Sequence, residues 1–140
     1  MNKDAVSAFK RELRNYNYYK VNLAGTLKLI DRNEYLLENV HGINPEKEFS
    51  FNSNPKAWVE SETYHRIREE LDRLEKRRDL RIRQIDYIES ILSKADADIK
   101  NICERIYRDG EDQLIVAKEY KIPRRTMNYN IDRELERILE

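Results

Sequence analysis

The chain has 140 residues and a formal net charge of zero, with 27 basic and 27 acidic side chains. Charged residues make up 39% of the sequence, against only three glycines and three prolines. This composition is typical of long, solvated helices and argues against a sheet protein. The balanced charge excludes nucleic-acid binding through bulk positive charge, so any contact with DNA has to be local.

Targeting and redox features point to the cytoplasm. No apolar run approaches the roughly 20 residues that a membrane-spanning helix needs. The polar residues Asn2 to Asp4 lead into an amphipathic helix, where a signal peptide would be apolar. The single cysteine, Cys103, fits a reducing compartment, and its place between Ile102 and Ile106 predicts a core position. We therefore expect a cytoplasmic protein with no membrane partner.

The first predicted helix covers residues 4–40. Gly25 lowers its stability by up to about 1 kcal/mol relative to alanine, which predicts a kink or break between residues 22 and 26. Gly42 is the expected left-handed cap. The apolar residues recur at three- and four-residue spacing, as in a coiled-coil seam; they are Val6, Phe9, Leu13, Tyr16, Leu23, Leu27, Ile30 and Leu37.

A loop at residues 43–56 separates this helix from the longest one, which we expect at residues 58–92. Asn54-Pro55 is the predicted cap and first turn of that second helix. Its seam also contains Arg78 and Arg81, which are unfavourable in a plain dimeric coiled coil. The apolar residues in heptad register are Tyr64, Ile67, Leu71, Leu74, Ile85, Ile88 and Leu92.

Residues 1–92 are thus predicted to form a helical hairpin, or coiled-coil arm, that serves self-association. The basic cluster at residues 76–83 (KRRDLRIR) has two interpretations: a strip that contacts phosphates, or a solvated helix face with pairs four residues apart. The balanced charge of residues 61–90 favours the solvated face.

Residues 93–140 are predicted to form a separate helix-turn-helix domain. Ser93 to Asp96 reads as a capping box, and Asp109-Gly110 ends the helix that follows. Asp112 can cap the next helix, in which Val116, Ala117 and Tyr120 share one face. After Ile122, a core residue, Pro123 opens the last helix. That helix is expected to bury Met127, Ile131, Leu135 and Ile138.

The opposite face of the last helix carries side chains suited to DNA. Its first turns would enter the major groove, where donors meet base edges. We expect base contacts from Arg124, Arg125, Asn128 and Tyr129. Phosphate contacts are expected from Lys118, Lys121, Thr126 and Arg133.

Catalytic chemistry is not indicated. The sequence has neither a glycine-rich phosphate loop nor a Cys/His set at metal-ligand spacing. The two histidines, His41 and His65, fall on different segments. We therefore predict no enzyme, no cofactor and no metal.

Three segments of the C-terminal region resemble the fourth region of bacterial sigma factors: Ile106-Tyr107-Arg108-Asp109-Gly110, Val116-Ala117, and residues 122–127 (IPRRTM). The chain is similar in particular to the RinA/ArpU-type late transcription activators of phages of low-GC Gram-positive bacteria. The order of its elements agrees with that group, from the helix at residues 11–20 (RELRNYNYYK) through a Pro/Asn-rich insert and a long charged helix to the final motif. Lys121 stands where that family usually has a turn glycine.

The resemblance implies an all-α fold that ends in a sigma-region-four-like helix-turn-helix. It also implies a phage-encoded, sequence-specific transcriptional regulator, a late-gene activator, that binds double-stranded DNA in a bacterial host cell and contacts host RNA polymerase. A homodimer is expected from the seam arginines and from the need to read two half-sites.

Two alternatives remain open. One is a small terminase subunit, although such proteins usually place the DNA-binding domain first. The other is a phage protein that binds and inhibits a host factor, which would be favoured if residues 124–133 were buried against the hairpin.

Overall fold

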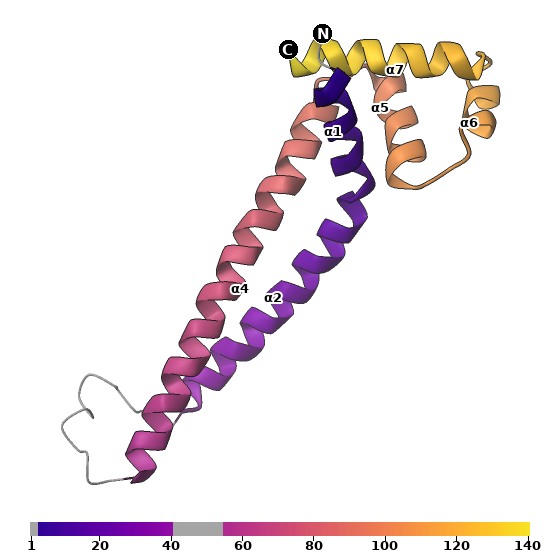
Figure 1. Cartoon of the computed structure of the whole chain (residues 1–140). Coiled ribbons are helices and arrows are strands. Elements are labelled where there is room, and N and C mark those ends of the chain that lie inside the picture. Colours follow the sequence, from indigo (N-terminus) through magenta and orange to yellow (C-terminus); the bar gives the residue numbers. More distant parts are fainter. Residues whose placement is uncertain (1–2, 41–54) are drawn as a thin grey trace. The chain divides into compact units, whose positions relative to one another are not determined.

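The computed structural model describes residues 3–40 and 55–140, with side chains from residue 61 onward in the second range. Every element in these ranges is helical (Figure 1), which confirms the all-α prediction. The elements are α1 (Lys3–Arg14), α2 (Tyr16–Glu38), α4 (Pro55–Ser93), α5 (Ala97–Cys103), the π-helical turn η1 (Glu104–Arg108), α6 (Gln113–Glu119) and α7 (Arg124–Leu139).

The helices form two compact units, and the boundary between them falls within α2 and α4. The hairpin unit comprises Asn22–Arg81, and the C-terminal unit comprises Met1–Val21 together with Ile82–Glu140. The predicted assignment of self-association to residues 1–92 and of DNA binding to residues 93–140 stays a prediction.

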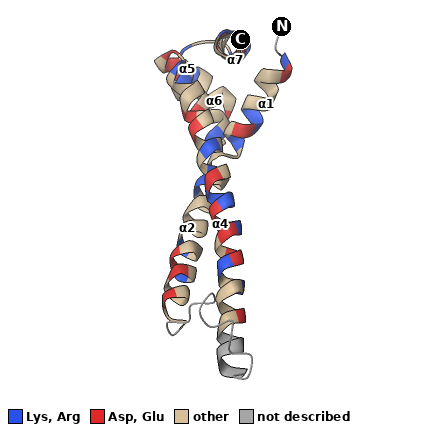
Figure 2. Cartoon of the chain, turned by 90° about the vertical axis from the view of Figure 1, so that its left-hand side faces the viewer, with Lys and Arg blue, Asp and Glu red and all other residues tan. Residues whose placement is uncertain are grey.

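In the hairpin unit, α2 and α4 lie side by side and run in opposite directions (Figure 1). This arrangement confirms the predicted N-terminal helical hairpin. Both helices contribute to one small apolar core, formed by Ile30, Leu71 and Leu74 with Leu37 and Ile67 against it. Acidic and basic residues alternate along α4 (Figure 2), as expected for a solvated helix.

The seam arginines find polar partners within the chain. Arg81 Nε donates a hydrogen bond to Asn22 Oδ1 across the hairpin at 2.8 Å. Arg78, with 34% of its side chain exposed, pairs with Asp79 at 3.1 Å. The hairpin therefore accommodates both arginines without a second copy, and they no longer argue for a dimer.

The predicted kink near Gly25 is wrong. The helix breaks earlier, at Asn15, and α2 runs on through Gly25. Thr26 and Ile30, just after the glycine, are 1% and 4% exposed, and their packing outweighs the glycine's low helix propensity. Thr26 also takes the seam position expected for Leu27, which is 43% exposed.

Both ends of α4 lie within three residues of the predicted bounds, 58 and 92. The helix begins at Pro55, as the Asn-Pro pair predicts, so the predicted loop is shorter than residues 43–56. The rest of that loop and the expected Gly42 cap lie outside the described residues. The capping box at Ser93 is wrong, because Ser93 still belongs to α4 and its hydroxyl donates to Ser90 O at 2.7 Å. Asp96 caps α5 instead, accepting from the Asp98 amide at 3.2 Å.

The C-terminal unit joins the first helix of the chain to the last five elements. The helix α7 contacts α1, α5 and α6 (Figure 1), and α1 also contacts η1. The ring of Phe9 on α1 meets that of Tyr87 on α4 edge to face, with centroids 6.1 Å apart. The core side chains are Val6, Phe9, Leu13, Tyr19, Ile85, Ile88, Ile91, Leu92, Ile102, Cys103, Ile106, Tyr107, Val116, Ala117, Met127, Ile131 and Leu135. The N-terminal helix is thus part of the core under α6 and α7.

Within the part of the chain that the structure describes, no helix is both long and apolar enough to cross a lipid bilayer.

Candidate nucleic-acid interface

The helix α6 starts and stops through local backbone chemistry. Asp112 accepts a hydrogen bond from the Leu114 amide at 2.8 Å, which confirms the predicted N-cap. At the other end, the Ile122 amide donates to Ala117 O at 3.2 Å and the Lys121 amide to Lys118 O at 3.1 Å. These two bonds form a Schellman motif, which requires a left-handed residue between them. Lys121 is that residue, with φ of 59°.

The helix α7 follows at once. Pro123 has an extended conformation with ψ of 146° and serves as the N-cap, so the helix starts at Arg124, one residue later than predicted. Met127, Ile131 and Leu135 are fully buried, as their spacing predicts. Val116 and Ala117 meet them from α6. Ile122 and Ile138 were also predicted to lie in the core, but both are half-buried. We call these two helices and their turn the α6–α7 pair.

Arg105, on η1, forms ion pairs with one carboxylate just before α6 and with another at the end of α6. Arg105 Nε lies 2.9 Å from Glu111 Oε2, and its Nη1 lies 2.5 Å from Glu119 Oε2. The hydrogen bonds to Glu111 and Glu119 raise the pKa of Arg105, and the hydrogen bond from Arg105 lowers the pKa of Glu119. The chain leaves η1 through Gly110, whose φ is +72°, as predicted from the Asp-Gly pair.

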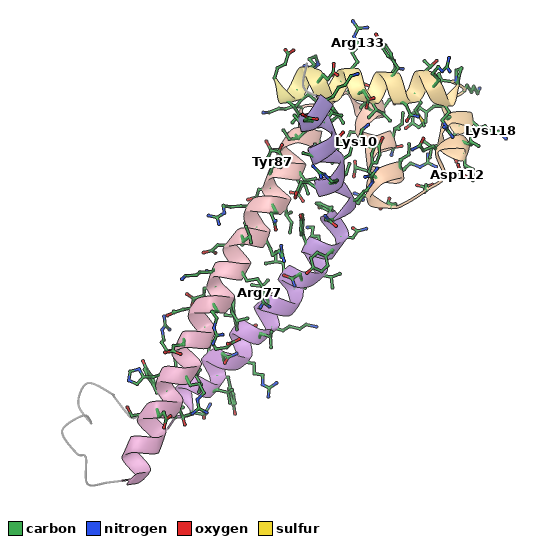
Figure 3. The ribbon with its side chains drawn as sticks, viewed as in Figure 1. Lys10, Arg77, Tyr87, Asp112, Lys118 and Arg133 are labelled. Carbon is green, nitrogen blue, oxygen red and sulfur yellow. The ribbon has the colours of Figure 1, made fainter. Side chains whose placement is uncertain are left out.

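The side chains predicted to contact DNA lie on the exposed surface of the α6–α7 pair. Tyr129 is 61% exposed. In Figure 3, Lys118 and Arg133 point away from the rest of the unit. The exposed predicted residues are Lys118, Lys121, Arg124, Arg125, Thr126, Tyr129 and Arg133. These side chains are therefore not part of the core of the C-terminal unit.

Three other arginines of this unit form ion pairs with carboxylates. Arg105 and Arg108 are each held by two carboxylates, and Arg137 by Glu134 at 2.5 Å. By contrast, within the described residues none of the five cations on the surface has a carboxylate partner; they are Lys118, Lys121, Arg124, Arg125 and Arg133. Their charges are available to a ligand outside the chain.

Asn128 is the exception among the predicted base contacts. It is half-buried, and its Nδ2 donates to Gln113 Oε1 on α6 at 3.2 Å. The sequence analysis did not single out Gln113. Its position as the first residue of a capped helix holds no functional signal, because only the crossing of α6 and α7 brings it to Asn128.

The sequence analysis also missed a polar contact between α1 and α7. Lys10 Nζ lies 2.5 Å from Asp132 Oδ1 and 5.3 Å from the centre of the Tyr107 ring. Burial lowers the pKa of Lys10, but the hydrogen bond to Asp132 and the charges of Tyr107 and Asp132 outweigh that effect, so this pKa lies above its ordinary value. Asp132 lies three residues after the exposed Tyr129 on α7. The ammonium group of Lys10 offsets the negative charge of the Asp132 carboxylate.

The far end of α7 is acidic. Glu134, Glu136 and Glu140 lie beyond the cationic surface, and Glu134 also accepts from the Asp96 amide at 2.9 Å. The hydrogen bond from Arg137 lowers the pKa of Glu134. Among the side chains described, at residues 3–40 and 61–140, no three His, Cys, Asp or Glu gather in a way that could hold a metal ion.

Searches for related proteins found no matching family model, no matching curated protein and no matching solved structure.

Proposed function

We propose that this chain is a phage-encoded, sequence-specific DNA-binding regulator of transcription, a late-gene activator, and that the α6–α7 pair is its helix-turn-helix. In this proposal α7 enters the major groove with its N-terminal turns. Arg124, Arg125, Asn128 and Tyr129 read base edges there. Lys118, Lys121, Thr126 and Arg133 hold the phosphates.

One observation carries the proposal: five exposed cations without a carboxylate partner among the described residues gather on one short helix pair. A chain with zero net charge needs such a local concentration to attract a polyanion. Exposed Lys and Arg side chains neutralise phosphates and release condensed counterions, which favours binding.

The geometry of the pair supports this use. The Schellman motif at Lys121 and the extended Pro123 fix the angle between the two helices. Buried Val116, Ala117 and Met127 hold them together. Rigid presentation matters because base-edge hydrogen bonds depend on register, which the phosphate contacts set.

The proposal also includes a homodimer and contact with host RNA polymerase. Reading two half-sites requires a homodimer. Apolar side chains on the outside of the hairpin unit, such as Leu29 at 41% and Leu36 at 40% exposure, offer it an apolar surface. At the acidic end of α7, Glu134 and Glu136 line one pocket together with Arg133. Contact with host RNA polymerase is also part of the proposal.

Selection of binding sites from random double-stranded DNA, followed by fluorescence anisotropy on the selected and scrambled sequences, tests the proposal. With three cationic phosphate contacts in each protomer of the dimer, a plot of log affinity against log salt should fall with a slope of about −5. The selected sequence should bind far more tightly than the scrambled one. Equal affinity for both, or no binding, would reject a sequence-specific regulator.

Light scattering on the same samples decides between this proposal and packaging. A dimer on the selected site agrees with a regulator. A larger ring that binds only DNA from a packaging region would identify a small terminase subunit, and a protein that binds no DNA would leave the inhibitor of a host factor.

A further inference from the structure

The contact between Gln113 and Asn128 leaves a defined set of free groups on Asn128. An asparagine side chain has two N–H donors and one carbonyl acceptor. One N–H donates to Gln113 Oε1 at 3.2 Å. One N–H donor and the carbonyl acceptor of the same amide therefore remain.

That remaining pair matches one base. Adenine presents an acceptor, N7, beside a donor, the N6 amino group, in the major groove, and an asparagine amide can bind both. Guanine presents two acceptors, N7 and O6, and thymine offers one acceptor and a methyl group.

We propose that Asn128 reads an adenine and that Gln113 is a positioning residue that orients the Asn128 amide by holding one of its N–H groups. This inference rests on the proposed function, and it adds the base identity and a residue outside the predicted contact set. Gln113 follows the N-cap Asp112, and its side chain is half-buried, so its carbonyl is held in place relative to α7.

The surroundings of Asn128 agree with this role. Its neighbours Arg124, Arg125 and Tyr129 are exposed, so a base edge can approach the half-buried amide between them. Within the described residues, no carboxylate is paired with the cations of this surface, so their charges are available to DNA. A fixed amide also loses less conformational freedom on binding than a free one.

The test compares base preferences, position by position, for the whole chain and for four variants. Asn128→Ala should abolish the preference at one position of the selected site, and wild type should require adenine there. Gln113→Leu removes the acceptor at similar size and should weaken that preference alone, by about tenfold. Gln113→Glu keeps an acceptor and should retain the preference, although its charge weakens binding to all sequences. Leu114→Ala, at a neighbouring residue that is 52% exposed, is the matched control and should change nothing.

A chemical probe isolates the contact itself. Replacing the adenine by 7-deazaadenine removes the N7 acceptor and should lower wild-type affinity about tenfold but leave Asn128→Ala unaffected. A requirement for guanine, or an unchanged preference in Gln113→Leu, would overturn this inference while leaving the regulator intact. If wild type selects no sequence at all, the proposed function fails and this inference fails with it.

Discussion

Lys10 Nζ and Asp132 Oδ1 lie 2.5 Å apart, although 122 positions separate them in the chain. The contact joins the first helix to the last one. Lys10 has 18% of its side chain exposed, against 49% for Asp132, so the lysine is the more desolvated partner. The α6–α7 pair therefore depends on the N-terminal helix for part of its support.

Replacing Lys10 by methionine should lower the free energy of unfolding by about 1 kcal/mol, because the pair is only partly shielded from solvent. Urea denaturation followed by circular dichroism measures the change. Lys3→Met is the control, since Lys3 is exposed and has no ion pair in the described residues. If both variants were equally stable, the contact would contribute nothing.

The pH dependence of this contact has a definite sign. The folded-state pKa of Lys10 is raised above its ordinary value of 10.5. The stabilisation is therefore complete below that value and is lost as the pH rises through the folded-state pKa. Urea midpoints measured from neutral to alkaline pH should fall more for wild type than for Lys10→Met; parallel curves would contradict the assignment.

Phe9→Ala tests whether α1 belongs to the C-terminal core. Phe9 is 1% exposed, so the cavity should cost about 3 kcal/mol or more. It should also weaken DNA binding, because α1 supports α7. Val21→Ala, at a residue that is 72% exposed, should change stability by less than about 0.5 kcal/mol. Thermal unfolding gives both numbers, and a minor effect of Phe9→Ala would show that residues 82–140 hold together without α1.

Lys121→Gly tests two roles of Lys121 separately: the effect of its backbone conformation on stability and the effect of its charge on DNA binding. With φ of 59°, Lys121 occupies a conformation that costs an ordinary residue about 1 kcal/mol, so glycine should stabilise the protein by that amount. The same change removes one proposed phosphate contact from each protomer of the dimer, so affinity should fall for all sequences and the salt slope should become shallower by about 1.8. Lys118→Ala should show the same loss of slope without the gain in stability. A glycine variant that keeps its affinity would remove Lys121 from the interface.

Arg125→Ala should cost about 1–3 kcal/mol of binding to the selected sequence and relax the preference at one position. The expected reason is the loss of hydrogen bonds to a base edge. Anisotropy titrations on selected and scrambled DNA measure both effects. Arg83→Ala removes an exposed arginine of α4 that has no ion pair in the described residues, and it serves as the matched control. Equal losses on both DNAs would make Arg125 a phosphate contact.

Cys103 should resist thiol reagents until the C-terminal unit opens. Burial raises the pKa of its thiol to about 12, and the side chain is 0% exposed. Because the unfolded chain loses this proton at the ordinary pKa of 9.0, the thiol's contribution to stability is complete below that pH and is lost as the pH rises toward 12. The rate of modification by a disulfide reagent should follow global unfolding in urea. Rapid modification of the folded protein would contradict a core position.

Local chemistry determined much of the α6–α7 pair. The Asp112 cap, the left-handed Gly110 and the buried spacing of Met127, Ile131 and Leu135 all follow from neighbours a few residues away. Side-chain caps, glycine φ angles and helical periodicity act over one or two turns, and a single sequence contains them completely.

Tertiary packing decided the rest. The break at Asn15 and the unbroken passage through Gly25 depend on which helices meet α1 and α2, and Gly25 alone predicts the wrong site. The contacts of Lys10 with Asp132 and of Gln113 with Asn128 join residues from different helices. The sequence by itself therefore determined where most helices begin and which face of each is apolar. Only the tertiary structure decided which faces pair, because burial depends on partners that are distant in the chain and lie beyond any local pattern.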